Sequence, residues 1–114
     1  MPHITIEHSG LSADDLNIDE LFDAIINSYS SCEAITPANV KMRAKGYDTA
    51  RVAELKAPFI HTSIALMRGP SQNQLQALAD AVHGMLCERY KDVAQVTLEI
   101  REMEPATYRK RAAS

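Results

Sequence analysis

Met1-Pro2-His3-Ile4-Thr5-Ile6-Glu7-His8 opens the chain, and apolar and polar residues alternate in it from Pro2 to Glu7. Positions 2, 4 and 6 are apolar and positions 3, 5 and 7 are polar, which predicts a β-strand with one buried face. The strand brings a proline to the second position of the chain. Removal of the initiator methionine, which is usual before a small residue, would leave Pro2 as a free secondary amine at the start of a strand.

Two interpretations of Pro2 follow. The proline ring is rigid and donates no hydrogen bond to a sheet. A free Pro2 amine at the end of a strand is therefore well positioned to act as a base. Most prolines that follow an initiator methionine have no chemical role, however, so the dipeptide alone favours a structural Pro2.

Composition restricts the class of protein. The chain has 114 residues, of which 46% are hydrophobic and 24% charged, so we expect one globular domain, residues 1–114. A net charge of −3 gives no basic excess for nucleic acid or an anionic membrane surface. No stretch has the length of a membrane span. Cys32 and Cys87 lack the spacing of a disulfide or metal framework, which predicts a reducing, cytoplasmic location.

The rest of the chain predicts two helices and three more strands. Asn17 and Glu20 resemble a helix-capping pair, and apolar residues then recur at helical spacing. Ser71 and Gln74 form a second capping motif, after which apolar residues at offsets of three and four predict a helix that reaches Tyr90. The alternating stretches predict strands at residues 39–45, 58–67 and 94–101.

This order is a duplicated β-α-β unit, residues 2–46 and 58–102, followed by a loosely held tail, residues 103–114. We therefore predict an α/β (α+β) fold in which the strands of each unit are parallel. Both helices should cover the same face of one four-stranded sheet. The other face would be largely polar and uncovered, so we expect a homo-oligomer in which sheets pack together. This face is predicted to carry Thr5, Glu7, Arg43, Thr97, Glu99 and Arg101.

Four stretches, in order along nearly the whole chain, resemble 5-carboxymethyl-2-hydroxymuconate isomerase of the tautomerase superfamily. They are residues 2–9 (PHITIEHS), 40–43 (VKMR), 59–62 (FIHT) and 98–102 (LEIRE). The resemblance implies a homotrimer, no cofactor, no metal and an amino-terminal proline as general base. It also implies an isomerase of homoprotocatechuate degradation, a route of aromatic compound catabolism. The substrate that the resemblance implies is a small anionic enol acid, 5-carboxymethyl-2-hydroxymuconate.

The chemistry implied by the resemblance requires one base that takes a proton from an enol oxygen and returns it to carbon. Burial and neighbouring cations would disfavour the charged amine and so bring Pro2 nearer to this task. Lys41 and Arg43 are the candidate substrate-binding cations, because parallel neighbouring strands begin at one edge of a sheet. Without the resemblance, a solvated basic stripe on an edge strand is the favoured interpretation.

Three departures from the family pattern bear on substrate identity. Arg68 is a third candidate for substrate binding, but it stands two positions before Pro70, where the family tends to carry its arginine. Lys41 stands where an arginine is more usual, which replaces a two-pronged carboxylate contact by a point charge. The tail carries Tyr108-Arg109-Lys110-Arg111 in place of a longer end with asparagines.

Other functions stay open. The chain could be another tautomerase, acting on 2-hydroxymuconate or phenylpyruvate, or a non-catalytic trimeric module that binds a small ligand. A metal site is not predicted, because the histidines lie on separate elements without ligand spacing. They are His3, His8, His61 and His83.

Overall fold

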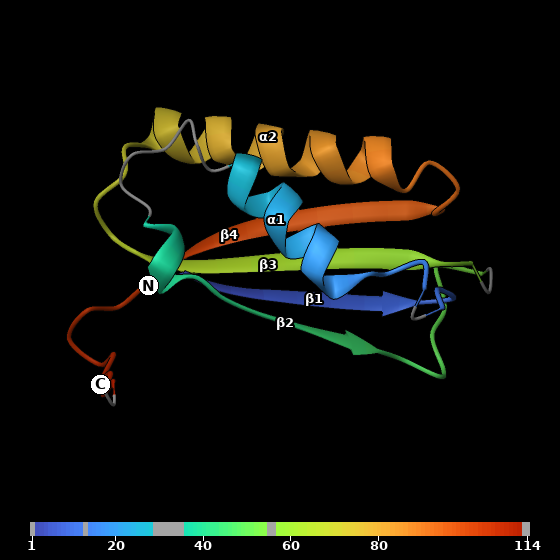
Figure 1. The fold of residues 1–114 in the computed structure, drawn as a ribbon, viewed down its shortest axis with the longest axis horizontal. Coiled ribbons are helices and arrows are strands. Elements are labelled where there is room, and N and C mark those ends of the chain that lie inside the picture. The colour runs from blue at the N-terminus through green and yellow to red at the C-terminus, as the bar shows by residue number, and fades with distance from the viewer. Residues whose placement is uncertain (1, 13, 29–35, 55–56, 113–114) are drawn as a thin grey trace.

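The computed structural model describes residues 2–12, 14–28, 36–54 and 57–112. Met1, Tyr29 and Cys32 lie outside these residues. Figure 1 shows two layers, a sheet with both helices on one of its faces. The elements are β1 (His3–Ser9), α1 (Ile18–Ser28), the 3-10 turn η2 (Pro37–Asn39), β2 (Lys41–Gly46), β3 (Phe59–Met67), α2 (Gln72–Arg89) and β4 (Gln95–Met103).

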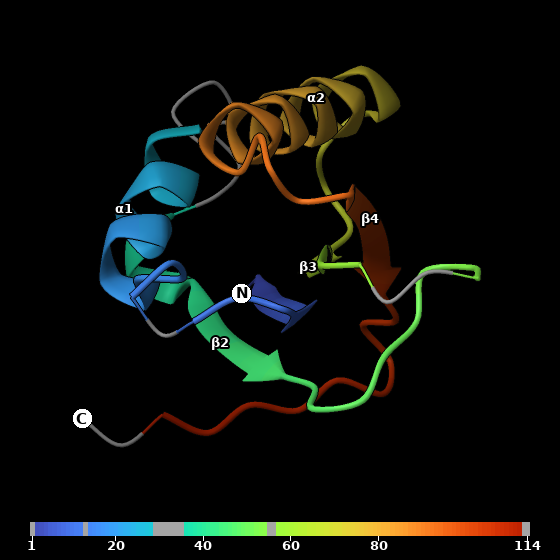
Figure 2. The same cartoon turned by 90° about the vertical axis from the view of Figure 1, so that its right-hand side faces the viewer.

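The sheet has the strand order β2-β1-β3-β4. β1 and β2 are parallel, as are β3 and β4, which confirms the predicted pairing within each unit. The two units meet where β1 and β3 run antiparallel, with His3 opposite Ala65. The amino end of β1 and the carboxyl end of β3 therefore share one edge of the sheet. Figure 2 looks along the strands and shows both helices above the same face, as predicted.

The core lies between this face and the helices. Ile4 and Ile6 of β1 are fully buried, while His3, Thr5 and Glu7 on the other face are only partly buried. The helices contribute residues spaced three or four apart, so each presents one apolar stripe to the sheet. The main helix residues in this core are Leu21, Ile25, Leu75, Leu78, Val82 and Leu86.

Every predicted strand boundary except the end of β3 was wrong by one or two residues. β1 begins at His3 and not at Pro2, and β2 begins at Lys41 because Pro37–Asn39 forms a 3-10 turn first. β4 extends beyond residue 101 to Met103, paired with Met67 at the end of β3. No helix among the described residues is long and apolar enough to span a membrane.

The predicted capping motif at the start of α2 is formed. The Ser71 hydroxyl accepts a hydrogen bond from the backbone N–H of Gln74 (3.2 Å), and the Gln74 side-chain oxygen accepts one from the N–H of Ser71 (2.8 Å). Two N–H groups that the helix itself cannot satisfy are thereby satisfied.

Replacing Ser71 with alanine is expected to lower the free energy of unfolding by about 0.5–2 kcal/mol, because the Gln74 N–H loses its acceptor. Urea denaturation followed by circular dichroism measures this change. Gln72→Ala, in the same exposed first turn, is the matched control and should change stability much less. Equal stability of the two variants would show that the cap does not stabilise α2.

The face of the sheet away from the helices carries polar side chains paired across strands or along them. His61 Nδ1 lies 2.6 Å from the Thr97 hydroxyl. Arg101 forms an ion pair with Glu99 (2.8 Å). The Tyr47 hydroxyl donates a hydrogen bond to Glu7. Among the described residues of the single chain, no helix or strand covers this face (Figure 2).

Candidate active site

Pro2 lies at the amino end of β1, the strand between β2 and β3 in the sheet. Its side chain is fully buried. The Pro2 carbonyl accepts a hydrogen bond from the backbone N–H of Lys41 (3.0 Å), which extends the β1–β2 pairing by one step. Its position alternates with those of Ile4 and Ile6, so the ring belongs to the helix-covered side of the sheet. Pro2 is therefore held firmly at the edge where the sequence predicted it.

Lys41 and Arg43 lie next to this end of β1. Lys41 pairs with His3 and Arg43 with Thr5 in the parallel register. Both side chains are exposed and project from the uncovered face, opposite the face to which the Pro2 ring belongs. The Lys41 ammonium donates to the Asn39 carbonyl (3.3 Å). The structure thus brings both cations to the Pro2 edge and separates them from its ring by the thickness of the sheet.

Arg68 directly follows the last residue of β3, which also ends at this edge. Its guanidinium forms ion pairs with Glu102 (3.6 Å) and Glu104 (3.2 Å). All three side chains are exposed, so these contacts hold the arginine only weakly. Counting contacts between described residues, Arg68 is the one predicted cation whose charge is already matched by carboxylates.

Two residues that we did not predict for the site, His3 and Tyr108, meet beside Pro2. His3 Nε2 lies 3.0 Å from the Tyr108 hydroxyl, and the two rings pack edge to face with centroids 5.9 Å apart. The tail is therefore not simply loose, because Tyr108 returns it to the start of β1. The polar face of β1 was the only sequence signal for His3, and the tail has no periodicity that would single out Tyr108.

His3 also contacts Arg43, whose Nη1 lies 3.4 Å from His3 Nδ1. Burial lowers the pKa of His3 from its ordinary value, and the positive charges of Arg43, Lys41 and the amino terminus lower it further. His3 is therefore neutral at pH 7 and can accept a hydrogen bond.

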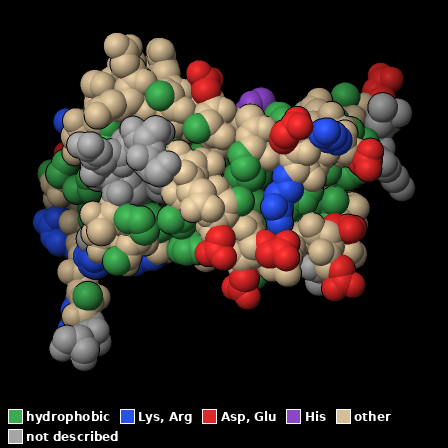
Figure 3. Space-filling model, turned by 45° about the horizontal axis from the view of Figure 1, so that its top comes forward, with side chains coloured by type: hydrophobic (Ala, Val, Ile, Leu, Met, Phe, Trp, Pro, Cys, Tyr) green, Lys and Arg blue, Asp and Glu red, His purple; other side chains and the backbone are tan. Residues whose placement is uncertain are grey.

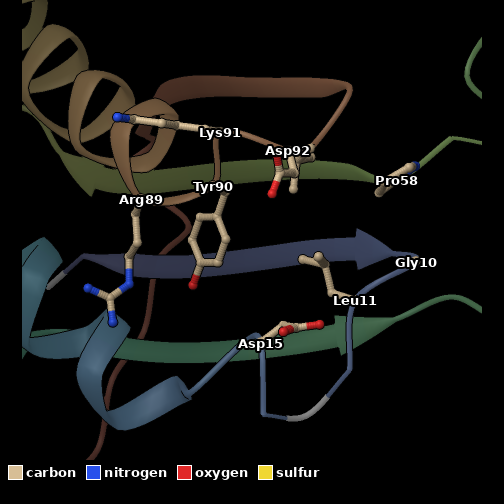
Figure 4. Close-up of a pocket in the computed structure, with 9 residues that line it drawn as sticks. Gly10, Leu11, Asp15, Pro58, Arg89, Tyr90, Lys91 and Asp92 are labelled. Carbon is tan, nitrogen blue, oxygen red and sulfur yellow. The ribbon is translucent and has the colours of Figure 1, made fainter.

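A cavity of about 480 Å³ lies at the other end of β1. Figure 4 shows Tyr90 and Lys91, at the end of α2, on one side of it and Leu11 on the other. Arg89, which also lines it, is paired with Glu20 of α1 (2.8 Å). The cavity contains none of the predicted site residues, so its size does not make it the candidate active site.

Charge is unevenly distributed over the molecule. In Figure 3 basic side chains lie at the left-hand end, where Figure 1 places the N-terminus and the tail, with few acidic ones beside them, whereas the basic side chains toward the right lie among acidic ones. Most of the acidic side chains in that view lie along the lower margin and at the right-hand end. The Pro2 end is therefore the more suitable one for an anionic ligand. Within the described ranges, no three His, Cys, Asp or Glu side chains are grouped to hold a metal ion.

Comparison with known proteins relates this arrangement to a family. The sequence model of the family "5-carboxymethyl-2-hydroxymuconate isomerase" matches residues 2–113. No curated protein matches the chain by sequence.

Solved structures share the fold. A 5-carboxymethyl-2-hydroxymuconate isomerase from Deinococcus radiodurans R1 superposes with a TM-score of 0.83 at 20% identity, covering 98% of this chain and 90% of that one. A 5-carboxymethyl-2-hydroxymuconate delta-isomerase gives 0.75 at 14% identity, covering 99% and 89%. A fused 4-OT, described as a symmetric trimer, gives 0.74 at 7% identity, covering 93% and 91%. The family match from residue 2 onward, together with this fold, shows that the chain belongs to the 5-carboxymethyl-2-hydroxymuconate isomerase family of the tautomerase superfamily.

Proposed function

We propose that this protein is a cofactor-free isomerase that moves a proton between the enol oxygen and a carbon of an unsaturated 2-hydroxy-dicarboxylate or tricarboxylate. The proposed substrate is 5-carboxymethyl-2-hydroxymuconate, the compound in the family name. The observation that carries the proposal is the placement of Pro2. It is buried at the start of β1, fixed to β2 at Lys41, in a chain that matches the family from residue 2.

Pro2 acts as the base in this proposal once Met1 has been removed. The secondary amine accepts the proton of the enol hydroxyl, which leaves a dienolate and a protonated amine. The protonated amine then returns the proton to carbon, so the reaction is balanced and the enzyme is unchanged. Burial of the ring and the nearby Lys41 and Arg43 disfavour the charged amine, which keeps it available as a base.

Lys41 and Arg43 bind the substrate carboxylates and stabilise the negative charge of the dienolate in this proposal. Both belong to the uncovered face, whereas the Pro2 nitrogen is part of the backbone at the sheet edge. The proposal therefore requires a substrate that spans this edge and contacts the nitrogen and the two cations together.

A homotrimer is part of the proposal. The uncovered face of the sheet is a large surface on which another copy could pack, and a structurally similar fused 4-OT is described as a symmetric trimer. Packing of copies would bury this face and shield the site from water, which strengthens the interactions between cations and substrate.

Arg43→Gln and Lys41→Gln are each expected to raise KM for 5-carboxymethyl-2-hydroxymuconate by roughly 10-fold or more. Each change removes a charged hydrogen-bond donor from a carboxylate. Steady-state kinetics at fixed pH measures the effect. Lys45→Gln is the matched control on the same strand and face, because Lys45 lies over the Tyr47 ring (5.3 Å), away from Pro2. Equal KM values for all three variants would contradict the assignment.

The substrate class is tested by ultraviolet-monitored ketonisation of three enols by the wild-type protein. They are 5-carboxymethyl-2-hydroxymuconate, 2-hydroxymuconate and phenylenolpyruvate. Preference for the first supports the proposed substrate. Preference for a smaller enol keeps the mechanism and changes the substrate. No turnover of any of them, with Pro2 shown to be free by intact mass, would reject the isomerase and favour a non-catalytic ligand-binding trimer.

A further inference from the structure

His3 lies between Arg43 and Tyr108, and the chemistry of the three groups fixes the direction of their hydrogen bonds. An arginine side chain only donates, so His3 Nδ1 must be the acceptor of the 3.4 Å contact with Arg43. A neutral imidazole that accepts at Nδ1 carries its proton at Nε2. The Nε2–H then donates to the Tyr108 hydroxyl at 3.0 Å. The chain of contacts therefore runs from Arg43 through His3 to Tyr108.

A neutral partner suits an arginine that must bind an anion. Among the described residues, Arg68 is paired with Glu102 and Glu104, and Arg101 with Glu99, whereas Arg43 has no carboxylate within ion-pair distance. A carboxylate partner would neutralise the guanidinium. Histidine Nδ1 orients it and leaves its charge for a ligand.

We propose that His3 and Tyr108 are positioning residues that hold the Arg43 guanidinium ready for a substrate carboxylate, and that this hold is lost at acid pH. The inference rests on the proposed function, in which Arg43 binds substrate. Protonation of His3 places a hydrogen on Nδ1, which can then no longer accept from Arg43.

The surroundings of His3 agree with a neutral ring at pH 7. From β2 it faces Lys41 and Arg43, and from the tail it faces Tyr108. Its partner on β3, Ala65, carries no charge, and Arg101 follows in the same row on β4. The pKa of His3 is lowered from its ordinary value, first by burial and then by these cations and the amino terminus. The contact with Arg43 is therefore intact at neutral pH and is lost as pH falls through this lowered pKa.

The hydrogen-bond chain is tested without any substrate by ¹⁵N NMR of histidine-labelled protein. At pH 7 His3 is expected to be neutral with its proton on Nε2, and this proton should be protected from exchange. Tyr108→Phe should abolish that protection, whereas Tyr47→Phe, at the far end of the same sheet face, should leave it unchanged. A proton on Nδ1 at pH 7, alone or with one on Nε2, would overturn the proposal.

The positioning role is tested by kinetics with 5-carboxymethyl-2-hydroxymuconate. Tyr108→Phe and His3→Ala should raise KM by about twofold to tenfold, with kcat changed by less than about twofold, because one orienting hydrogen bond is lost. His3→Asn places an oxygen near the position of Nδ1 and does not titrate. At neutral pH its KM should fall below that of His3→Ala to that of Tyr108→Phe, because only the Tyr108 contact is lost, and it should lack the rise in KM expected for the wild type as pH falls through the lowered pKa of His3.

The outcomes distinguish a failure of the positioning role from a failure of the proposed isomerase. Wild-type KM values in both Tyr108→Phe and His3→Ala would overturn the positioning role while the isomerase stands. Absence of turnover by the wild type would reject the proposed function and the substrate role of Arg43 with it, and the NMR experiment would still decide the hydrogen-bond chain.

Discussion

Replacement of Pro2 with alanine is expected to lower kcat for ketonisation by about 100-fold or more, the usual contribution of a positioned general base. Alanine supplies a primary amine on a flexible backbone, whereas proline supplies a secondary amine whose ring is locked by burial. The loss should appear in kcat more than in KM, since Lys41 and Arg43 remain to bind substrate. Stopped-flow or steady-state ultraviolet assays measure it.

Pro58→Ala is the control for this prediction. Pro58 precedes β3 at the opposite end of the sheet and lines the cavity there, so its loss should leave kcat unchanged. Intact mass must show that the Pro2→Ala variant begins at residue 2, and circular dichroism must show that it is folded. A folded, correctly processed Pro2→Ala variant with wild-type kcat would rule out Pro2 as the base.

Replacement of Leu78 with alanine is expected to lower the free energy of unfolding by about 2–5 kcal/mol. Leu78 is 0% exposed in the middle of α2, on the stripe that packs against the sheet. Alanine would leave a cavity where the leucine side chain had been, and the surrounding β-sheet can close it only in part. Urea denaturation at one fixed protein concentration measures the change, because assembly into oligomers would otherwise alter the apparent stability.

Gln76→Ala is the matched control, two residues earlier on the exposed face of the same helix. It removes a side chain of similar length from solvent and should change stability by less than about 0.5 kcal/mol. A Leu78→Ala variant as stable as Gln76→Ala would contradict the core assignment for α2.

Most of the fold could be predicted from local periodicity. The alternation in residues 2–8 identified the buried face of β1, since successive strand residues point to opposite sides. The spacing after Ser71 identified the buried stripe of α2. Periodicity says which face of an element is buried but not which element lies beside it, so the antiparallel meeting of β1 and β3 came only from the structure.

The candidate site was predictable where it depends on strand direction. Because the two strands of the first unit are parallel, Pro2 and Lys41 must lie at the same edge of the sheet, and the structure places them there. The hydrogen bond of His3 to Tyr108 joins residues 105 positions apart in the sequence. No local pattern encodes such a contact, because it depends on where a non-periodic tail lies after the sheet has formed.

The central claim is that the Pro2 nitrogen, freed from Met1, carries the proton. Its most direct test compares two forms of the same chain: the wild type and a chain with one glutamine inserted between Met1 and Pro2, which keeps the proline nitrogen in a peptide bond. Intact mass establishes the first residue of each form, and ketonisation of 5-carboxymethyl-2-hydroxymuconate is measured for both.

We predict that the wild type begins at Pro2 and turns over the enol, and that the extended form loses about 100-fold or more of kcat. Equal turnover by the two forms, or full activity of a wild type that retains Met1, would contradict the mechanism.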